Sequence, residues 1–235
     1  MTITDLLILQ IIAHLLSDFT FQSEKWARFK NEKGFKSEYL KWHVIIVFIV
    51  SWLLSFQLKF IFASIIIALF HWIIDGLKHL IFHNEKIKKF AFFIDQVIHL
   101  ILITGLILLF NHFFELKPYI QLPISKHWLL IIAGFIFITK PANIIIREVF
   151  KTYGIYLGNE EDILSAGMLI GVSERIITLT LILSGQFEAV GFIIAAKSIL
   201  RFKDTDTTKT EYVLIGTLLS FGTAILTGIG IQMIK

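Results

Sequence analysis

Residues 71–99 read HWIIDGLKHLIFHNEKIKKFAFFIDQVIH, and this stretch decides how the chain folds. A basic connector separates two apolar segments, and each segment carries an ionisable pair four residues apart, His71 with Asp75 and Asp95 with His99. Residues at i and i+4 lie on one face of a helix, about one turn apart. The stretch therefore predicts two neighbouring helices joined by a short loop, each with a His/Asp pair on one face.

A third pair of the same kind lies upstream, in HLLSD at 14–18 on the first apolar segment. His43 opens the second apolar segment. Charged or metal-ligand side chains are costly in membrane-like sequence, so such a group indicates a functional site. The alternative is that the His and Asp side chains pair with one another and hold the helices together.

The composition is that of a polytopic membrane protein. Of 235 residues, 56% are hydrophobic and only 17% are charged. Cysteine is absent, so thiolate sites are excluded, and any metal must be held by imidazole and carboxylate. The net charge of +4 comes from basic residues in short connectors. We interpret these as topology signals and contacts to membrane lipids, with no nucleic-acid partner.

The apolar runs predict an all-α, polytopic transmembrane helix bundle with about eight spans, seven to eight. The first four spans form a half, 1–112, that carries the His/Asp cluster, and the others form a second half, 113–235. The predicted spans are 3–21, 43–57, 60–77, 91–110, 128–146, 163–184, 187–200 and 212–234. Three of them, 43–57, 60–77 and 187–200, are shorter than usual.

The positive connectors at 22–42 and 78–90 are expected in the cytoplasm, which places both termini outside a plasma or inner membrane. With this topology, spans that run in opposite directions bring their polar groups to one depth near the inner face. The side chains concerned are His14, Asp18, His43, His71, Asp75, Asp95 and His99. Convergence of this kind favours a site over a chance scatter of polar residues.

The cluster is expected to hold one or two divalent ions, Zn, Mn or Mg, with an open position for water. The predicted metal ligands are Asp18, His71, Asp75, Asp95 and His99. His14 and His43 are the predicted catalytic residues, each as a further ligand or as a general base. Gln22 and Lys78 are placed to orient ligands or to bind an anionic substrate group.

The second half carries its own polar set. Lys140, Lys197 and Arg201 lie near the predicted inner face and are candidates for an anion clamp in substrate binding. Glu174 and Arg175 are predicted to form a structural ion pair. The alternative to the clamp pairs Glu174 with Arg175 or Lys197 inside the bundle and leaves Arg201 to reach the lipid headgroups.

These motifs resemble a bacterial integral-membrane family known as domain of unknown function 3307. The likeness is carried by HLLSDFTFQ at 14–22, His43, HWIIDGLK at 71–78 and DQVIH at 95–99. We expect it to continue through SER at 173–175 and GFIIAAKSILRF at 191–202. The resemblance implies a bacterial membrane protein and brings no activity with it.

The leading hypothesis is a metal-dependent hydrolase that acts from the cytoplasmic side on a phosphorylated or lipid-linked substrate. A second hypothesis is a carrier or channel that uses the cluster as a cation or proton relay. A third is a non-catalytic membrane scaffold. The outer halves of the first four spans read as almost purely Leu, Ile, Val and Phe, which favours the enzyme over the carrier.

Overall fold

The computed structural model describes residues 1–81, 85–120, 123–155, 161–200 and 207–234. These residues form helices joined by turns, with no strand among them. They divide into two compact units, Met1–Leu129 and Leu130–Lys235. The division falls inside helix α7 (Lys126–Ile138), whereas the sequence placed it at residue 112.

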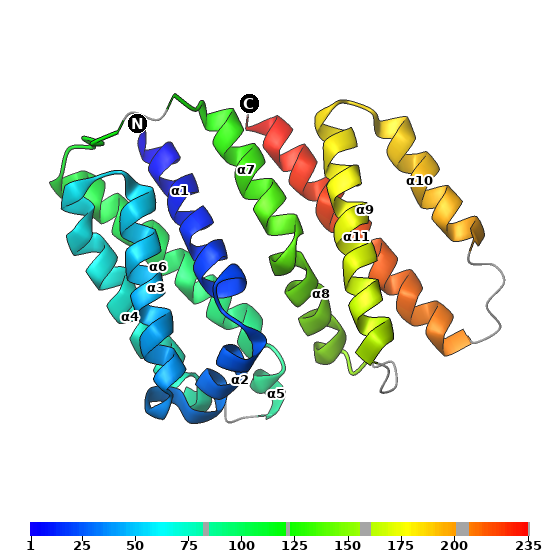
Figure 1. The fold of residues 1–235 in the computed structure, drawn as a ribbon, viewed down its shortest axis with the longest axis horizontal. Helices are drawn as coiled ribbons and strands as arrows, with labels where there is room; N and C mark the ends of the chain where they lie inside the picture. Colours follow the sequence, from blue (N-terminus) through cyan, green and yellow to red (C-terminus); the bar gives the residue numbers. More distant parts are fainter. Residues whose placement is uncertain (82–84, 121–122, 156–160, 201–206, 235) are drawn as a thin grey trace. The chain divides into compact units, whose positions relative to one another are not determined.

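Four long helices build the first unit (Figure 1). They are α1 (Ile3–Leu15), which continues into a π-helical turn (Leu16–Thr20), α3 (Glu38–Ser55), α4 (Ile61–Ile81) and α6 (Ala91–Phe113). Helix α4 packs on α3 and α6, and α1 packs on the same two helices. Their shared core includes Leu6, Val47, Phe60, Ile67 and Ile107, all buried.

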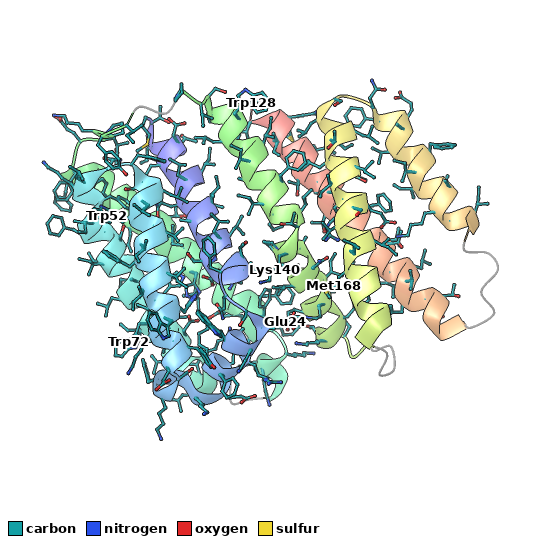
Figure 2. All side chains as sticks on the ribbon, in the orientation of Figure 1. Glu24, Trp52, Trp72, Trp128, Lys140 and Met168 are labelled. Atoms are coloured by element: carbon teal, nitrogen blue, oxygen red, sulfur yellow. The ribbon has the colours of Figure 1, made fainter. Side chains whose placement is uncertain are left out.

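Large apolar side chains on these helices also point outward. Leu53, Phe62, Leu69, Ile101 and Leu108 are each at least half exposed. Figure 2 shows Trp52 and Trp72 toward opposite ends of the first unit. Apolar outer surfaces with tryptophans near both ends are typical of helices in a lipid bilayer.

One end of the first unit is covered by residues 24–36, which we call the cap. It consists of α2 (Glu24–Lys33) and a 3-10 turn (Gly34–Lys36), packed on α3 and α4. Ser23 begins α2 by accepting a hydrogen bond from the backbone N–H of Trp26. The short helix α5 (Glu85–Lys88) follows α4. The sequence had assigned the cap region to a connector, and the structure corrects this: it is a helix docked on the bundle.

The second unit comprises α8 (Lys140–Thr152), α9 (Glu161–Leu183), α10 (Phe187–Leu200) and α11 (Thr207–Met233), together with the end of α7. Helix α9 packs on α8, α10 and α11. Ile138, Leu179 and Ile231 form the buried centre of this unit.

Helices α7 and α8 bend by 46° where they meet, and Pro141 stands in the first turn of α8. A proline cannot donate a backbone hydrogen bond, so it removes one donor from the helical ladder at this point. At this break the buried side chain of Arg175 donates to the carbonyl oxygens of Ile138 and Thr139 and to Asn143 Oδ1. A helix can break within the membrane when side chains such as this one supply hydrogen bonds to the backbone at the break.

Helices occur at all eight predicted positions, but fewer meet the requirements for crossing a bilayer. Among the described residues, five are long and apolar enough: Ile3–Thr20, Glu38–Ser55, Leu58–Lys78, Ala91–Phe113 and Thr210–Met233. The bent pair α7–α8 makes a sixth if it counts as one span. Helix α10 has 14 residues, fewer than the roughly 20 that a crossing needs. The chain is thus a helical, multi-pass membrane protein with five to six candidate spans.

A substitution at Gly76 tests how the cap is docked. A Cβ built at Gly76 would collide with the ring of Phe35 in the cap, whereas one at Gly105 on α6 would meet nothing within 4 Å. We expect Gly76→Ala to loosen the cap and speed tryptic cleavage within residues 24–36 in detergent. Gly105→Ala is the control and should cleave at the wild-type rate. Equal cleavage rates in both variants would show that Phe35 does not hold the cap.

A substitution of Arg175 tests whether its side chain stabilises the break between α7 and α8. We expect Arg175→Met to lower the free energy of unfolding by about 1–3 kcal/mol, because the Ile138 carbonyl loses a buried donor. Thermal unfolding in detergent measures the change. Arg147→Met, on the half-exposed face of α8, is the control and should unfold close to the wild-type temperature. A variant at Arg175 as stable as this control would contradict the role assigned to the guanidinium.

Candidate metal centre

The structure brings all seven predicted His and Asp side chains of the first unit together at the end that carries the cap. They come from α1 and its π-helical turn, α3, α4 and α6. Six of the seven residues are no more than 5% exposed, and the Asp18 side chain is 7% exposed. The group consists of His14, Asp18, His43, His71, Asp75, Asp95 and His99.

Asp18 lies at the centre of the imidazoles. The π-helical turn after α1 widens the helix locally and carries Asp18; such turns are frequent at functional sites. Asp18 Oδ1 lies 3.5 Å from His14 Nδ1, 3.5 Å from His71 Nε2 and 3.6 Å from His43 Nε2. None of these four atoms has a hydrogen-bond partner within the described part of the chain.

Gln96 fixes the tautomer of His14. Its amide Nε2 donates to Asp95 Oδ2 at 3.2 Å, because a carboxylate can only accept. Its amide oxygen therefore faces His14 Nε2, also at 3.2 Å, and that nitrogen carries the hydrogen. In a neutral imidazole the other nitrogen is then a bare acceptor. His14 Nδ1 consequently presents a lone pair to the Asp18 carboxylate.

Backbone carbonyls fix His71 and His99 in the same way. His71 Nδ1 lies 3.3 Å from the carbonyl oxygen of Ile67, and His99 Nδ1 lies 2.8 Å from that of Asp95. Carbonyls only accept, so each Nδ1 carries the hydrogen and each Nε2 is left bare. A backbone carbonyl that orients the far nitrogen is the usual support for a metal-binding histidine.

Bare nitrogens and a carboxylate oxygen thus face one another in a buried place. Lone pairs at this distance repel, and an isolated buried charge is strongly unfavourable. The arrangement is stabilised by a cation between the groups, either a proton on an imidazole or a metal ion. Imidazole nitrogen and carboxylate oxygen together suit Zn, Mn and Fe.

The donor atoms form two adjacent groups. His14, Asp18 and His71 make group one, and Asp75, Asp95 and His99 make group two; within each, the ligand atoms lie within 4.8 Å of one another. The two groups meet where the rings of His71 and His99 approach, with centroids 4.1 Å apart. Both sets of side chains fit a metal ion, and His43 stands between them, with Nε2 3.5 Å from Asp75 Oδ2.

Two lysines neutralise group two. Lys30, from the cap, donates to Asp75 Oδ2 at 2.7 Å and to Gln22 Oε1 at 3.3 Å. Lys78 donates to Asp95 Oδ2 at 2.9 Å. Burial alone would lower the pKa of Lys30, but the carboxylates of Asp75 and Asp18 outweigh it and raise that pKa above its usual 10.5. Lys30 is therefore a charged, buried part of the site.

Sequence reasoning missed Lys30. It lies 45 residues from Asp75, and no spacing connects the two. The pattern of the cap itself, a serine N-cap before an amphipathic stretch, was the available signal for a helix, although not for its docking position. Docking on α4 is what turns an ordinary lysine of a basic segment into a partner of the site.

One predicted pair is not kept together in the structure. His71 approaches Asp18, whereas its neighbour Asp75 binds Lys30 and approaches His43, so the predicted pair on α4 is split. Gln22 and Lys78 contact Lys30 and Asp95, respectively. The split arises because the two side chains of α4 find partners on different neighbouring elements.

In the second unit, Glu174 forms its ion pair with Lys197, which is one of the two partners expected for it. Arg175 donates to the backbone carbonyls of Ile138 and Thr139 at the helix break. Lys140 begins α8 in this unit. Arg201 lies outside the described residues, so the proposed anion clamp of Lys140, Lys197 and Arg201 stays a prediction.

The family comparison agrees with the motifs that build the site. The model of the protein family of unknown function DUF3307 matches residues 6–131. This chain belongs to that family. The match includes every His and Asp of the cluster and ends before the second-half motifs at 173–175 and 191–202, so the likeness expected there is not part of it. No functionally curated protein and no solved structure matches the chain.

Lys30→Met tests the buried ion pair. We expect it to lower the free energy of unfolding by roughly 3–5 kcal/mol, because it leaves the Asp75 charge buried without its partner. The pKa of Lys30 is raised on folding, so this stabilisation is fully present below the pKa of an unfolded lysine. It is lost only as pH rises through the still higher pKa of the folded state. Thermal unfolding in detergent between pH 7 and about pH 11 measures both effects.

Lys33→Met is the matched control, since Lys33 is an exposed lysine at the end of the same helix. It should retain wild-type stability and pH dependence. Equal stability of the two variants would contradict a structural role for the Lys30 charge.

Proposed function

We propose that this protein is a membrane-embedded, metal-dependent hydrolase that acts on a phosphorylated or lipid-linked substrate from the cytoplasmic side. One observation carries the proposal: the bare nitrogens of His14 and His71 converge on an unpartnered oxygen of Asp18. A divalent ion at that point would satisfy all three atoms. Bound there, it would polarise a phosphoryl or carbonyl oxygen and make water a better nucleophile.

The charges at the site support an anionic substrate. Three carboxylates, of Asp18, Asp75 and Asp95, face two ammonium groups, of Lys30 and Lys78. With neutral imidazoles the cluster carries one negative charge, and one divalent ion turns it into one positive charge. A phosphate or another anionic headgroup would then be attracted to the site, and a neutral substrate would not.

His43 is the proposed general base. Neither of its ring nitrogens has a hydrogen-bond partner within the described residues. Its Nε2 lies 3.6 Å from Asp18 and 3.5 Å from Asp75, so a proton taken up at Nε2 would be stabilised by two carboxylates. This position suits acceptance of a proton from an attacking water and its return to a leaving group.

The basic segments support a cytoplasmic location for the site. The cap and the stretch after α4 contain many of the lysines of the first unit, and positive connectors stay in the cytoplasm. An even number of spans, six or eight, would place both termini outside. The substrate would then reach the cluster from the cytoplasm or from the inner lipid leaflet.

A second candidate function is a proton or cation relay. Buried polar side chains continue beyond the cluster: Gln10 and Ser51 exchange hydrogen bonds, and Ser51 Oγ lies 3.3 Å from Ser64 Oγ. Ser55 and Gln57 are buried further along. The core of the first unit is thus less purely apolar than its sequence indicated, and this observation favours a carrier.

Metal content distinguishes the two functions. Elemental mass spectrometry of the detergent-purified protein should find a near-stoichiometric divalent ion that is lost in a His14→Ala, His71→Ala double variant. His112→Ala, at an exposed position of α6, is the control and should keep the ion. Absence of metal after reconstitution with Zn, Mn and Mg would reject the hydrolase, and proton flux in proteoliposomes would then test the relay.

His43→Gln tests the general base. We expect this variant to retain the metal and lose about 10²–10⁴-fold in the rate of hydrolysis. The assay is a screen of phosphate esters and lipid-linked phosphates with the metal-loaded protein, followed by kinetics on any substrate found. An unchanged rate on that substrate would remove His43 from the mechanism.

A further inference from the structure

We infer that the cluster takes a single divalent ion, held by His14, Asp18 and His71, and that Lys30 and Lys78 keep group two free of metal. The inference rests on the proposed metal-binding function and deepens it. It assigns different roles to two sets of donor atoms that the sequence treats alike. It also assigns the lysine of the cap a role in setting metal stoichiometry.

The spacing of group one fits a small ion of low coordination number. Bonds of about 2.0–2.1 Å to nitrogen and oxygen, in tetrahedral geometry, set neighbouring ligand atoms about 3.4 Å apart. Asp18 Oδ1 lies 3.5 Å from both His14 Nδ1 and His71 Nε2. Two imidazoles and one carboxylate with a fourth position open are the ligand set of a catalytic zinc ion. Mg²⁺, which needs six oxygen-type ligands, fits less well.

The two groups differ in whether a lysine neutralises their carboxylates. Asp18 has no lysine within ion-pair distance among the described residues, so its charge is available to a metal ion. In group two, Asp75 and Asp95 each share one oxygen with an ammonium group, at 2.7 and 2.9 Å. A divalent ion on the remaining oxygens would lie close to both ammonium groups and be repelled by them.

Geometry alone would allow a second ion. Asp75 Oδ1, Asp95 Oδ1 and His99 Nε2 have no hydrogen-bond partners in the described part of the chain. The three residues also offer ligand atoms within 4.8 Å of one another. The rings of His71 and His99 are close enough for a two-metal site, in which the ions lie about 3.5–4 Å apart. The two ammonium groups are therefore what restricts the site to one ion.

The test measures bound Zn²⁺ and Co²⁺ per chain in detergent-purified protein, by elemental mass spectrometry and by the visible spectrum of Co²⁺. The proteins are wild type, His71→Ala, Asp75→Asn and Lys30→Met, with Lys33→Met as the matched control. We expect one ion in wild type, in Asp75→Asn and in Lys33→Met, and none in His71→Ala. Lys30→Met should bind a second ion. The Co²⁺ form should show the intense visible bands of four-coordinate geometry.

Each other outcome has a separate meaning. No metal in wild type rejects the proposed function itself. Two ions in wild type, or loss of the ion in Asp75→Asn with retention in His71→Ala, overturns the one-ion assignment and leaves the metal function standing. One ion in a folded Lys30→Met rejects the role of the lysine. If Lys30→Met does not fold, the comparison of His71→Ala with Asp75→Asn still decides which group holds the ion.

Discussion

The first unit depends on the contact between the Asp18 carboxylate and the bare nitrogens of the histidines around it. An unpaired carboxylate and opposed lone pairs are both energetically unfavourable when they are buried. A positive charge, from a proton or a metal ion, must therefore lie between these groups. The core of Leu, Ile, Val and Phe supplies packing energy but cannot supply that charge. The stability of the unit and its chemistry thus rest on the same requirement.

The cap supplies a positive charge to the neighbouring carboxylate of Asp75. It carries Lys30 over the end of the bundle, where the ammonium group neutralises Asp75, and its Phe35 lies against the backbone of α4 at Gly76. The cap therefore contributes a charged side chain and covers the site at once. A change in its docking would alter both the electrostatics of the cluster and the access of water to it.

The second unit solves a related problem with different groups. There the chain breaks between α7 and α8, and the buried Arg175 donates to the backbone carbonyls of Ile138 and Thr139 at the break. In both units a basic side chain from a distant segment binds buried polar groups for which the apolar core offers no partner. The family match ends near the start of the second unit, so the cluster is what the family comparison covers.

The sequence by itself determined the helical membrane class, the positions of the long apolar helices and the His and Asp residues of the cluster, because hydrophobic runs and i, i+4 pairs are local signals. Tertiary structure decided the partners: His71 with Asp18, Asp75 with Lys30, and Glu174 with Lys197. It also decided the docking of the cap and the number of candidate spans. These depend on which side chains meet across helices, and no local spacing encodes a contact between residues 45 positions apart.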